Sequence, residues 1–336
     1  MRPNDMETPI LQIRNLKKYF AIPTAFRLKD FFKKDQHKTL KAVDGVSFEV
    51  YAKETLGLVG ESGCGKTTIG RVILRAIEPT SGDILFAGQP IVQLKEKELL
   101  DFRKRVQVVF QDPFLSLNPR MSIQRILREP LQVHRIVPDG EVRDKIAELM
   151  TLVGLDPNLS TLYPYELSTG QRKRVAIARA IATNPTLLVA DEAVSGLDVS
   201  VKAQILNLMS DLRERLSLTY VFISHDLSVV QFVCHKVAIM YLGKIVEFGS
   251  TKAIFENPLH PYTVALLKSI PKVRAIGEEP IPIKSALKGE IPSPIDLPSG
   301  CRFQARCSRR TERCTESEPP MVEISKDQQV SCFLCN

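Results

Sequence analysis

The sequence has 336 residues, of which 44% are hydrophobic and 25% are charged, and its formal net charge is +8. This length suggests about two domains, and the composition excludes a disordered or fibrous chain. No apolar run reaches the roughly 18 residues that cross a bilayer, and the N-terminal residues lack the apolar stretch of a signal peptide. We therefore expect a protein of the cytoplasm. Its positive charge indicates a solvated basic surface or contact with an anionic membrane face, and the pattern predicts no nucleic-acid partner.

The first predicted elements are two strands, at residues 10–16 and 42–51, in which apolar and polar residues alternate. A basic segment, residues 26–41, separates them and contains two adjacent phenylalanines. We interpret this segment as a solvated hairpin extension, with contact to a membrane or a partner protein as the alternative.

A phosphate-binding loop follows the second strand. Residues 54–60 form an apolar run typical of a buried strand, and residues 67–77 have helical apolar spacing. The chain between them fits G-x-x-x-x-G-K-[ST], in which backbone amides at a helix N-terminus surround phosphate oxygens. We expect Lys66 to reach the phosphates and Thr67 to bind Mg²⁺. The nucleotide-binding residues predicted here are Gly60, Ser62, Gly63, Cys64, Gly65, Lys66, Thr67 and Thr68.

The middle of the chain alternates predicted strands and helices, which favours an α/β fold with a parallel sheet. A more polar helical section is expected at about 118–172, inserted between the strands. The further strands are predicted at residues 82–87, 105–110, 186–190 and 219–223, with a hairpin over 237–248.

Two sets of polar residues lie near predicted element ends. Asp191 and Glu192 end a buried strand, where Asp191 would bind Mg²⁺ and Glu192 would orient or deprotonate the attacking water; a helix-capping acid pair is the alternative. Ser168 and Gly170 begin a strongly periodic helix, and they suit a γ-phosphate or an ordinary N-cap.

Together these motifs resemble the ATP-binding cassette (ABC) ATPases over residues 10–255. In this family a signature pentapeptide is usually Leu-Ser-Gly-Gly-Gln. The pentapeptide of this chain is residues Leu167 to Gln171, and it has Thr169 at the third place. The resemblance implies a P-loop NTPase fold with a RecA-like core, an antiparallel β subdomain and an inserted helical subdomain. It also implies ATP and Mg²⁺ as ligands, and closure of two ATPase subunits around the nucleotide.

The resemblance gives roles to single positions. Gln111 corresponds to the glutamine that contacts Mg²⁺ and the attacking water, and His225 to the histidine that contacts the γ-phosphate. Asp198 corresponds to the acid that communicates across the dimer, and Phe20, or its neighbour Tyr19, to the aromatic residue that stacks on adenine. The pentapeptide residues Ser168, Gly170 and Gln171 would complete the partner's nucleotide site.

Three local patterns resemble the ATPase subunits of dipeptide and oligopeptide importers, and specifically the second of two paired ATPases. They are the segment Phe110 to Arg120, the run Asn257 to Thr263 and a cysteine-containing tail. The resemblance implies that a permease docks at the segment Gln111 to Arg120. This resemblance implies a homologous second ATPase, two membrane permeases, an extracytoplasmic binding protein and a location on the cytoplasmic face of the membrane. Nickel chelates or oligosaccharides are alternative substrates, and a soluble ABC ATPase acting on nucleic acid or ribosomes is the alternative class.

The C-terminal part of the chain is expected to be a separate extension, residues 257–336, after a nucleotide-binding domain at residues 1–256. Five of the seven cysteines lie in this part, and in a cytoplasmic protein they favour a metal site over disulfides. The resemblance to importers favours a [4Fe–4S] cluster; zinc and free thiols are the alternatives, and Cys335 could replace Cys332. The predicted ligands are Cys301, Cys307, Cys314 and Cys332.

Overall fold

The structure, a computed structural model, describes residues 8–22, 38–112, 116–270 and 292–335. Most of the basic segment, including its three phenylalanines, lies outside these residues. The described residues form an eight-stranded sheet with the order β11-β12-β10-β9-β3-β8-β7-β6 and a four-stranded sheet with the order β2-β1-β4-β5. No helix among them is long and apolar enough to cross a membrane.

The strands of the four-stranded sheet are β1 (Leu11–Ile22), β2 (Lys38–Val50), β4 (Ser81–Phe86) and β5 (Gln89–Pro90). The strands of the larger sheet are β3 (Thr55–Val59), β6 (Val106–Val109), β7 (Leu187–Asp191), β8 (Thr219–Ser224), β9 (Lys236–Tyr241), β10 (Lys244–Ser250), β11 (Val322–Ser325) and β12 (Gln328–Val330). Every strand expected from the sequence is present, including the hairpin β9–β10, which turns at Leu242 and Gly243.

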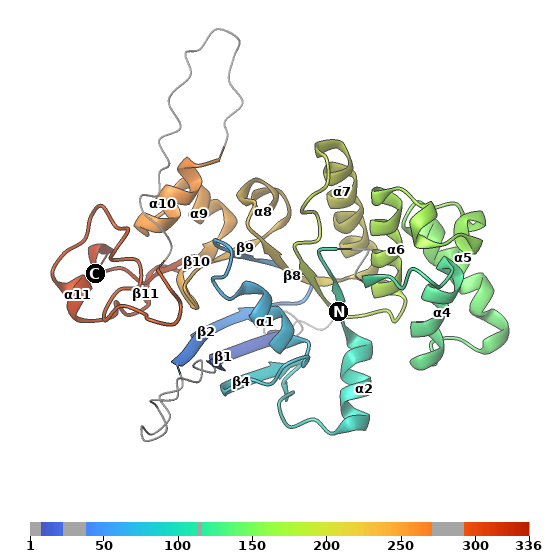
Figure 1. Cartoon of the computed structure of the whole chain (residues 1–336), viewed down its shortest axis with the longest axis horizontal. Coiled ribbons are helices and arrows are strands. Elements are labelled where there is room, and N and C mark those ends of the chain that lie inside the picture. The colour runs from blue at the N-terminus through green and yellow to red at the C-terminus, as the bar shows by residue number, and fades with distance from the viewer. Residues whose placement is uncertain (1–7, 23–37, 113–115, 271–291, 336) are drawn as a thin grey trace, which may run out of the picture.

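The helices fall into two groups by position. Three lie at one end of the molecule, in the section where helices were expected: α4 (Ile123–Val133), α5 (Val142–Leu152) and α6 (Thr169–Ile181) (Figure 1). The others are α1 (Lys66–Ile73), α2 (Glu96–Arg105), α7 (Val199–Leu216), α8 (Leu227–Val233), α9 (Thr251–Glu256), α10 (Pro261–Lys268) and α11 (Arg313–Glu316). Single 3₁₀ turns occur at Asp139–Glu141, Pro157–Thr161, Pro164–Glu166 and Phe333–Cys335.

The central strands of the large sheet are buried on both faces. Along β8, Val221 and Ile223 pack into a core shared with α1 and the small sheet, whereas Tyr220 and Phe222 pack into a second core shared with α4 to α8. Because alternate residues of a strand point to opposite faces, an apolar run with no polar alternation fits this position. Figure 1 shows α1 and the small sheet on one side, with α7 and α8 on the other.

The parallel strands β3, β8, β7 and β6 set the position of the candidate site. Val59 of β3 lies opposite Ser224 of β8, and Asp191 of β7 lies opposite Ile223 of β8. The carboxyl ends of parallel strands meet at one edge of a sheet, which is where ligands bind in open α/β sheets. The phosphate-binding loop and the acid pair therefore reach the same edge.

The C-terminal residues are joined to this sheet. Strand β12 pairs antiparallel with β10, so the sheet continues into the cysteine-containing part of the chain, at the opposite end of the molecule from α4 and α5 (Figure 1). Glu247 of β10 is completely buried and accepts hydrogen bonds from the amides of Leu259 and His260 and from the side chain of Gln328. These bonds connect the extension to the core at a position that no local sequence pattern indicates.

Candidate nucleotide site

The phosphate-binding loop has the geometry that its sequence predicts. Gly65 adopts a φ of +108° directly before α1, and a Cβ atom there would lie 2.1 Å from the carbonyl oxygen of Ala42. Only glycine fits this position. The Lys66 ammonium donates hydrogen bonds to the carbonyls of Gly60, at 2.7 Å, and Glu61, at 3.0 Å. The lysine thus lies within the loop, where its charge is available to phosphate oxygens.

The other loop residues differ in exposure. Ser62 and Gly63 are exposed at the tip of the loop, and Thr68 is half-buried in the first turn of α1. Cys64 is 4% exposed and belongs to the apolar core next to α1. Burial raises the pKa of its thiol, so this cysteine is a neutral core side chain.

Thr67 and Asp191 come together at the sheet edge. The Thr67 hydroxyl donates a 3.1 Å hydrogen bond to the Asp191 carboxylate. Burial raises the pKa of Asp191, and the neighbouring Glu192 adds to the effect, whereas the Thr67 bond opposes it. A hydroxyl and a carboxylate at hydrogen-bond distance form the hard oxygen donor set that suits Mg²⁺, and a cation would offset the cost of the buried charge.

Glu192 and His225 form the second pair at this edge. The Glu192 carboxylate lies 3.2 Å from Nδ1 of His225, which follows the adjacent strand β8. Glu192 has a φ of +47°, a left-handed conformation that costs about 1–3 kcal/mol for a non-glycine residue. Its amide donates to the carbonyl of Ile223 at 3.0 Å, which holds this conformation. The strain therefore lies at the residue predicted to be the general base.

Gln111 lies beyond the end of β6, beside β7, and is exposed. Sequence reasoning missed the residue that holds its backbone. Lys173 of α6 is 1% exposed, and its ammonium donates to the carbonyls of Phe110, at 2.7 Å, and Gln111, at 3.0 Å. Lys173 is the second residue after the pentapeptide, and its position within an otherwise apolar helix face was the available signal.

The pentapeptide and Asp198 form a separate group. Ser168 caps α6: its hydroxyl accepts from the amide of Gln171, and the Gln171 side chain accepts from the amide of Ser168. A Cβ atom on Gly170 would lie 3.2 Å from the side chain of Val201, so α6 and α7 approach closely there. Asp198 caps α7 by accepting from the amide of Val201 at 3.0 Å.

This group lines a cavity of its own, about 430 Å³ in volume, to which the phosphate-binding loop contributes none of the described residues that line it. Within one chain, the structure brings Ser168, Gly170, Gln171 and Asp198 together but does not bring them to Lys66.

The two aromatic candidates for adenine stacking lie in β1. The Tyr19 hydroxyl donates to the carboxylate of Asp44 in β2, and the Tyr19 amide donates to the hydroxyl of Thr80. Phe20 is half-buried, with the Lys18 ammonium 4.9 Å from its ring centre. The geometry leaves both residues as candidates.

The four predicted cysteine ligands line one small cavity beside Phe303, together with His260. However, no three His, Cys, Asp or Glu side chains in the described part of the chain are placed to hold a metal ion. Burial raises the pKa of Cys301 and Cys307, and that of Cys332 to about 11. Neutral thiols are poor metal ligands. The four cysteines therefore share a cavity without forming a metal-ligand set as placed, and the [4Fe–4S] cluster stays a prediction.

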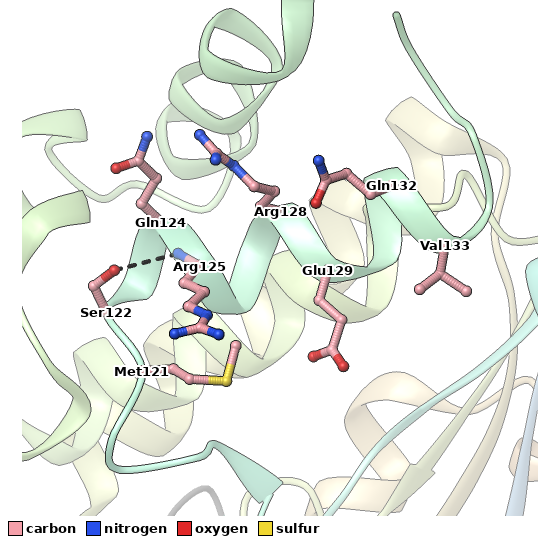
Figure 2. A pocket seen from close by; sticks show the side chains of 8 residues that line it. All are labelled: Met121, Ser122, Gln124, Arg125, Arg128, Glu129, Gln132 and Val133. Carbon is pink, nitrogen blue, oxygen red and sulfur yellow. Dashed lines mark hydrogen bonds between the residues drawn. The ribbon is translucent and has the colours of Figure 1, made fainter. Parts of the chain in front are cut away.

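A groove of about 560 Å³ follows α4 at the far end of the molecule from the cysteines. Figure 2 shows Arg125, Arg128 and Glu129 along the helix, with Met121 and Val133 near its two ends. Charged and apolar side chains therefore both line this groove. The groove begins directly after the segment Gln111 to Arg120, which the sequence predicted to contact a permease.

A solved structure identifies the fold, and sequence relatives identify the family. The solved structure of cbiO1 from Clostridium perfringens, part of the ABC transporter complex cbiONQ, has a TM-score of 0.62 and 27% identity, over 75% of this chain and 92% of that one. Residues 43–195 match the ABC transporter family, and residues 246–314 match the oligopeptide/dipeptide transporter C-terminal region.

Relatives match over nearly the whole length. The oligopeptide transport ATP-binding protein AppF of Bacillus subtilis is 48% identical, and the dipeptide transport ATP-binding protein DppF of Haemophilus influenzae is 45% identical; in each case 97% of both chains is covered. The chain therefore belongs to the ABC transporter ATPases that carry the oligopeptide/dipeptide transporter C-terminal region.

Proposed function

We propose that this chain is the ATP-hydrolysing subunit that energises import of dipeptides or oligopeptides through a membrane ABC transporter. The observation that carries the peptide assignment is the C-terminal region at residues 246–314, which matches that of oligopeptide/dipeptide transporters. The names of AppF and DppF support the same assignment. Nickel chelates and oligosaccharides are the competing substrates.

ATP hydrolysis is assigned to the sheet edge. Lys66 would bind the β- and γ-phosphates, and Thr67, Asp191 and Gln111 would hold Mg²⁺, which neutralises phosphate charge when bound. Glu192 would orient and deprotonate the attacking water, and His225 would contact the γ-phosphate. The 3.1 Å Thr67–Asp191 and 3.2 Å Glu192–His225 contacts support these roles, because they place the required side chains on neighbouring strand ends.

A second ATPase subunit would complete each site. The pentapeptide group lines its own exposed cavity, so Ser168, Gly170 and Gln171 are available to the nucleotide on a facing subunit. Asp198 lies in the same cavity and would contact the facing subunit. A chain alone would then bind ATP but hydrolyse it slowly, because the facing subunit's contacts to the γ-phosphate are absent.

The permeases would dock at the end of the molecule that carries α4. Lys173 and Arg179 of α6 bind backbone carbonyls of Gln111 and Ser116, on either side of residues 113–115. Movement of the pentapeptide at the start of α6 would therefore be passed to this segment and to the adjacent α4 groove. The groove's two arginines favour an acidic permease segment. In this arrangement the chain would lie on the cytoplasmic face of the membrane.

The experiment is purification of the full chain from membranes with its partners, followed by identification of the co-purified proteins and solute. We expect a homologous ATPase, two multi-span permeases and peptide-stimulated ATPase activity once the extracytoplasmic binding protein is added. Stimulation by nickel chelates or oligosaccharides instead would redirect the substrate assignment. Recovery with ribosomes or DNA, and no permease, would contradict the transporter role.

A finer part of the proposal concerns the cysteines: Cys301, Cys307, Cys314 and Cys332 would hold a [4Fe–4S] cluster, or zinc as the alternative. The support is that all four line one cavity; binding would require the thiols to ionise and move closer together. Anaerobic purification with elemental analysis and visible absorption tests this point. Four irons per chain would support the cluster, and one zinc per chain would support the alternative. If neither metal is found, the cysteines are free thiols.

A further inference from the structure

The second residue of the phosphate-binding loop, Glu61, is held at both its backbone and its carboxylate by the C-terminal part of the chain. Arg306 donates to both carboxylate oxygens, with N–O distances of 2.6 Å and 3.0 Å. The amide of Glu61 donates a 3.0 Å hydrogen bond to the hydroxyl of Tyr262. Both partners lie more than 200 residues away in sequence, in the part of the chain that matches the oligopeptide/dipeptide transporter C-terminal region.

These contacts are buried and rigid. The Arg306 side chain is 5% exposed and that of Glu61 is 23% exposed, so solvent competes weakly for the pair. Tyr262 is completely buried, and its ring packs against Tyr241 and Phe303 with centroid distances of 4.8 Å and 5.4 Å. A bidentate arginine–carboxylate pair fixes orientation as well as distance. Glu61 is therefore held in one position.

The position of Glu61 determines where the phosphate-binding lysine lies. The carbonyl of Glu61 accepts from the Lys66 ammonium at 3.0 Å and from the amide of Cys64 at 3.3 Å. Rotation of the Glu61 peptide would move both contacts. The residue that Arg306 and Tyr262 hold is thus the residue that orients the inner surface of the loop.

A second contact from the same segment reaches the other side of the nucleotide site. Arg302 donates to the carboxylate of Asp44, which also binds the Tyr19 hydroxyl, and to the carbonyl of Leu242. Arg302 and Arg306 both lie between Cys301 and Cys307. One short stretch therefore contacts the phosphate-binding loop and, through Asp44 of β2, the strand that carries the adenine candidates.

We propose that Arg306 and Tyr262 are positioning residues for ATP binding, so that the C-terminal extension forms part of the nucleotide site through Glu61. The proposal rests on ATP binding by this family, and it is independent of which solute is transported. It predicts that losing these contacts weakens nucleotide affinity in a chain that remains folded.

The test measures the Kd of the full-length chain for a fluorescent ATP analogue in the presence of Mg²⁺, with thermal unfolding of each variant without nucleotide. We expect Arg306→Ala to raise the Kd about tenfold and Tyr262→Phe, which removes one oxygen and keeps the ring, to raise it about threefold. Arg306→Lys should recover part of the loss. One matched control is Arg310→Ala, which removes an exposed arginine of the same C-terminal extension. The other is Tyr220→Phe, which removes a buried hydroxyl elsewhere. Both variants should have a Kd within twofold of that of the unaltered chain.

A double-mutant cycle distinguishes positioning from general stability. If Arg306 acts through Glu61, Glu61→Gln and Arg306→Gln each weaken binding, and the double variant is no weaker than the worse single variant. Additive losses, or an Arg306→Ala Kd within twofold of the unaltered chain, would overturn the proposal. Failure of the unaltered chain to bind the analogue would instead contradict the nucleotide site itself.

Discussion

The ammonium of Lys173, in the helix that begins at the pentapeptide, donates a 3.0 Å hydrogen bond to the backbone carbonyl of Gln111. This bond joins the two segments that are predicted to contact a facing subunit's nucleotide and a permease. We expect Lys173→Met to lower ATPase activity in the assembled transporter while the isolated chain binds ATP within twofold of normal. Equal losses of binding and activity would contradict a coupling role. Lys97→Met, on the exposed face of α2, serves as the control.

The same residue predicts a pH dependence of stability. Burial lowers the pKa of Lys173 from 10.5 to about 8, although the nearby Asp112 opposes the shift. Between these values the unfolded chain binds more protons than the folded chain, so this residue makes the free energy of unfolding rise with pH. Across that window, the free energy of unfolding measured in urea should rise less with pH in Lys173→Met than in the unaltered chain or in Lys97→Met. Identical slopes in all three proteins would show that Lys173 titrates normally.

Glu192→Gln should abolish most hydrolysis and retain ATP. The amide keeps the size of the side chain and a contact to His225 but cannot take a proton, and general-base removal costs about 10²–10⁴ in rate. Steady-state phosphate release by the assembled transporter measures the loss, and retained nucleotide on the purified complex measures binding. Glu256→Gln, exposed in α9, is the control. Turnover by Glu192→Gln at the control rate would remove the assigned role.

Ser168→Ala should separate binding from hydrolysis. Because Ser168 lies apart from Lys66 within one chain, we expect unchanged ATP affinity in the isolated subunit but lower hydrolysis in the assembled complex. The substitution also removes an N-cap, which costs about 1 kcal/mol. Ser250→Ala controls for that cost, since the Ser250 hydroxyl caps α9 by accepting from the amide of Ala253 at 3.2 Å. If both variants hydrolyse ATP equally, the pentapeptide serine acts only as a cap.

Glu247→Ala should destabilise the attachment of the C-terminal extension. The substitution leaves two backbone amides and the Gln328 side chain without their buried acceptor, and we expect a loss of about 3–5 kcal/mol. Urea unfolding gives the loss, and limited proteolysis should cleave first after residue 250. Glu323→Ala, in the outer strand β11, is the control. Stability equal to that control would show that Glu247 does not hold the extension.

The sequence by itself determined the local parts of this site. The phosphate-binding loop, the Asp191–Glu192 pair and the pentapeptide are contiguous motifs, and the short-range rules of strand, turn and helix start place their side chains. The order of strands and helices also predicted the parallel sheet. Helices α2 and α7 to α11 were not predicted: in α2, for example, only Phe102 is buried, so its apolar periodicity is weak.

Only the tertiary structure decided how distant segments meet. The Glu61–Arg306 pair, the Lys173–Gln111 bond and the pairing of β12 with β10 join residues 245, 62 and about 80 positions apart. Such contacts depend on the packing of whole elements, which no local spacing encodes. The cysteines show the same limit: their number and pattern predict a metal cluster, but a metal site requires thiolates at bonding distance, and the packing of the C-terminal extension sets those distances.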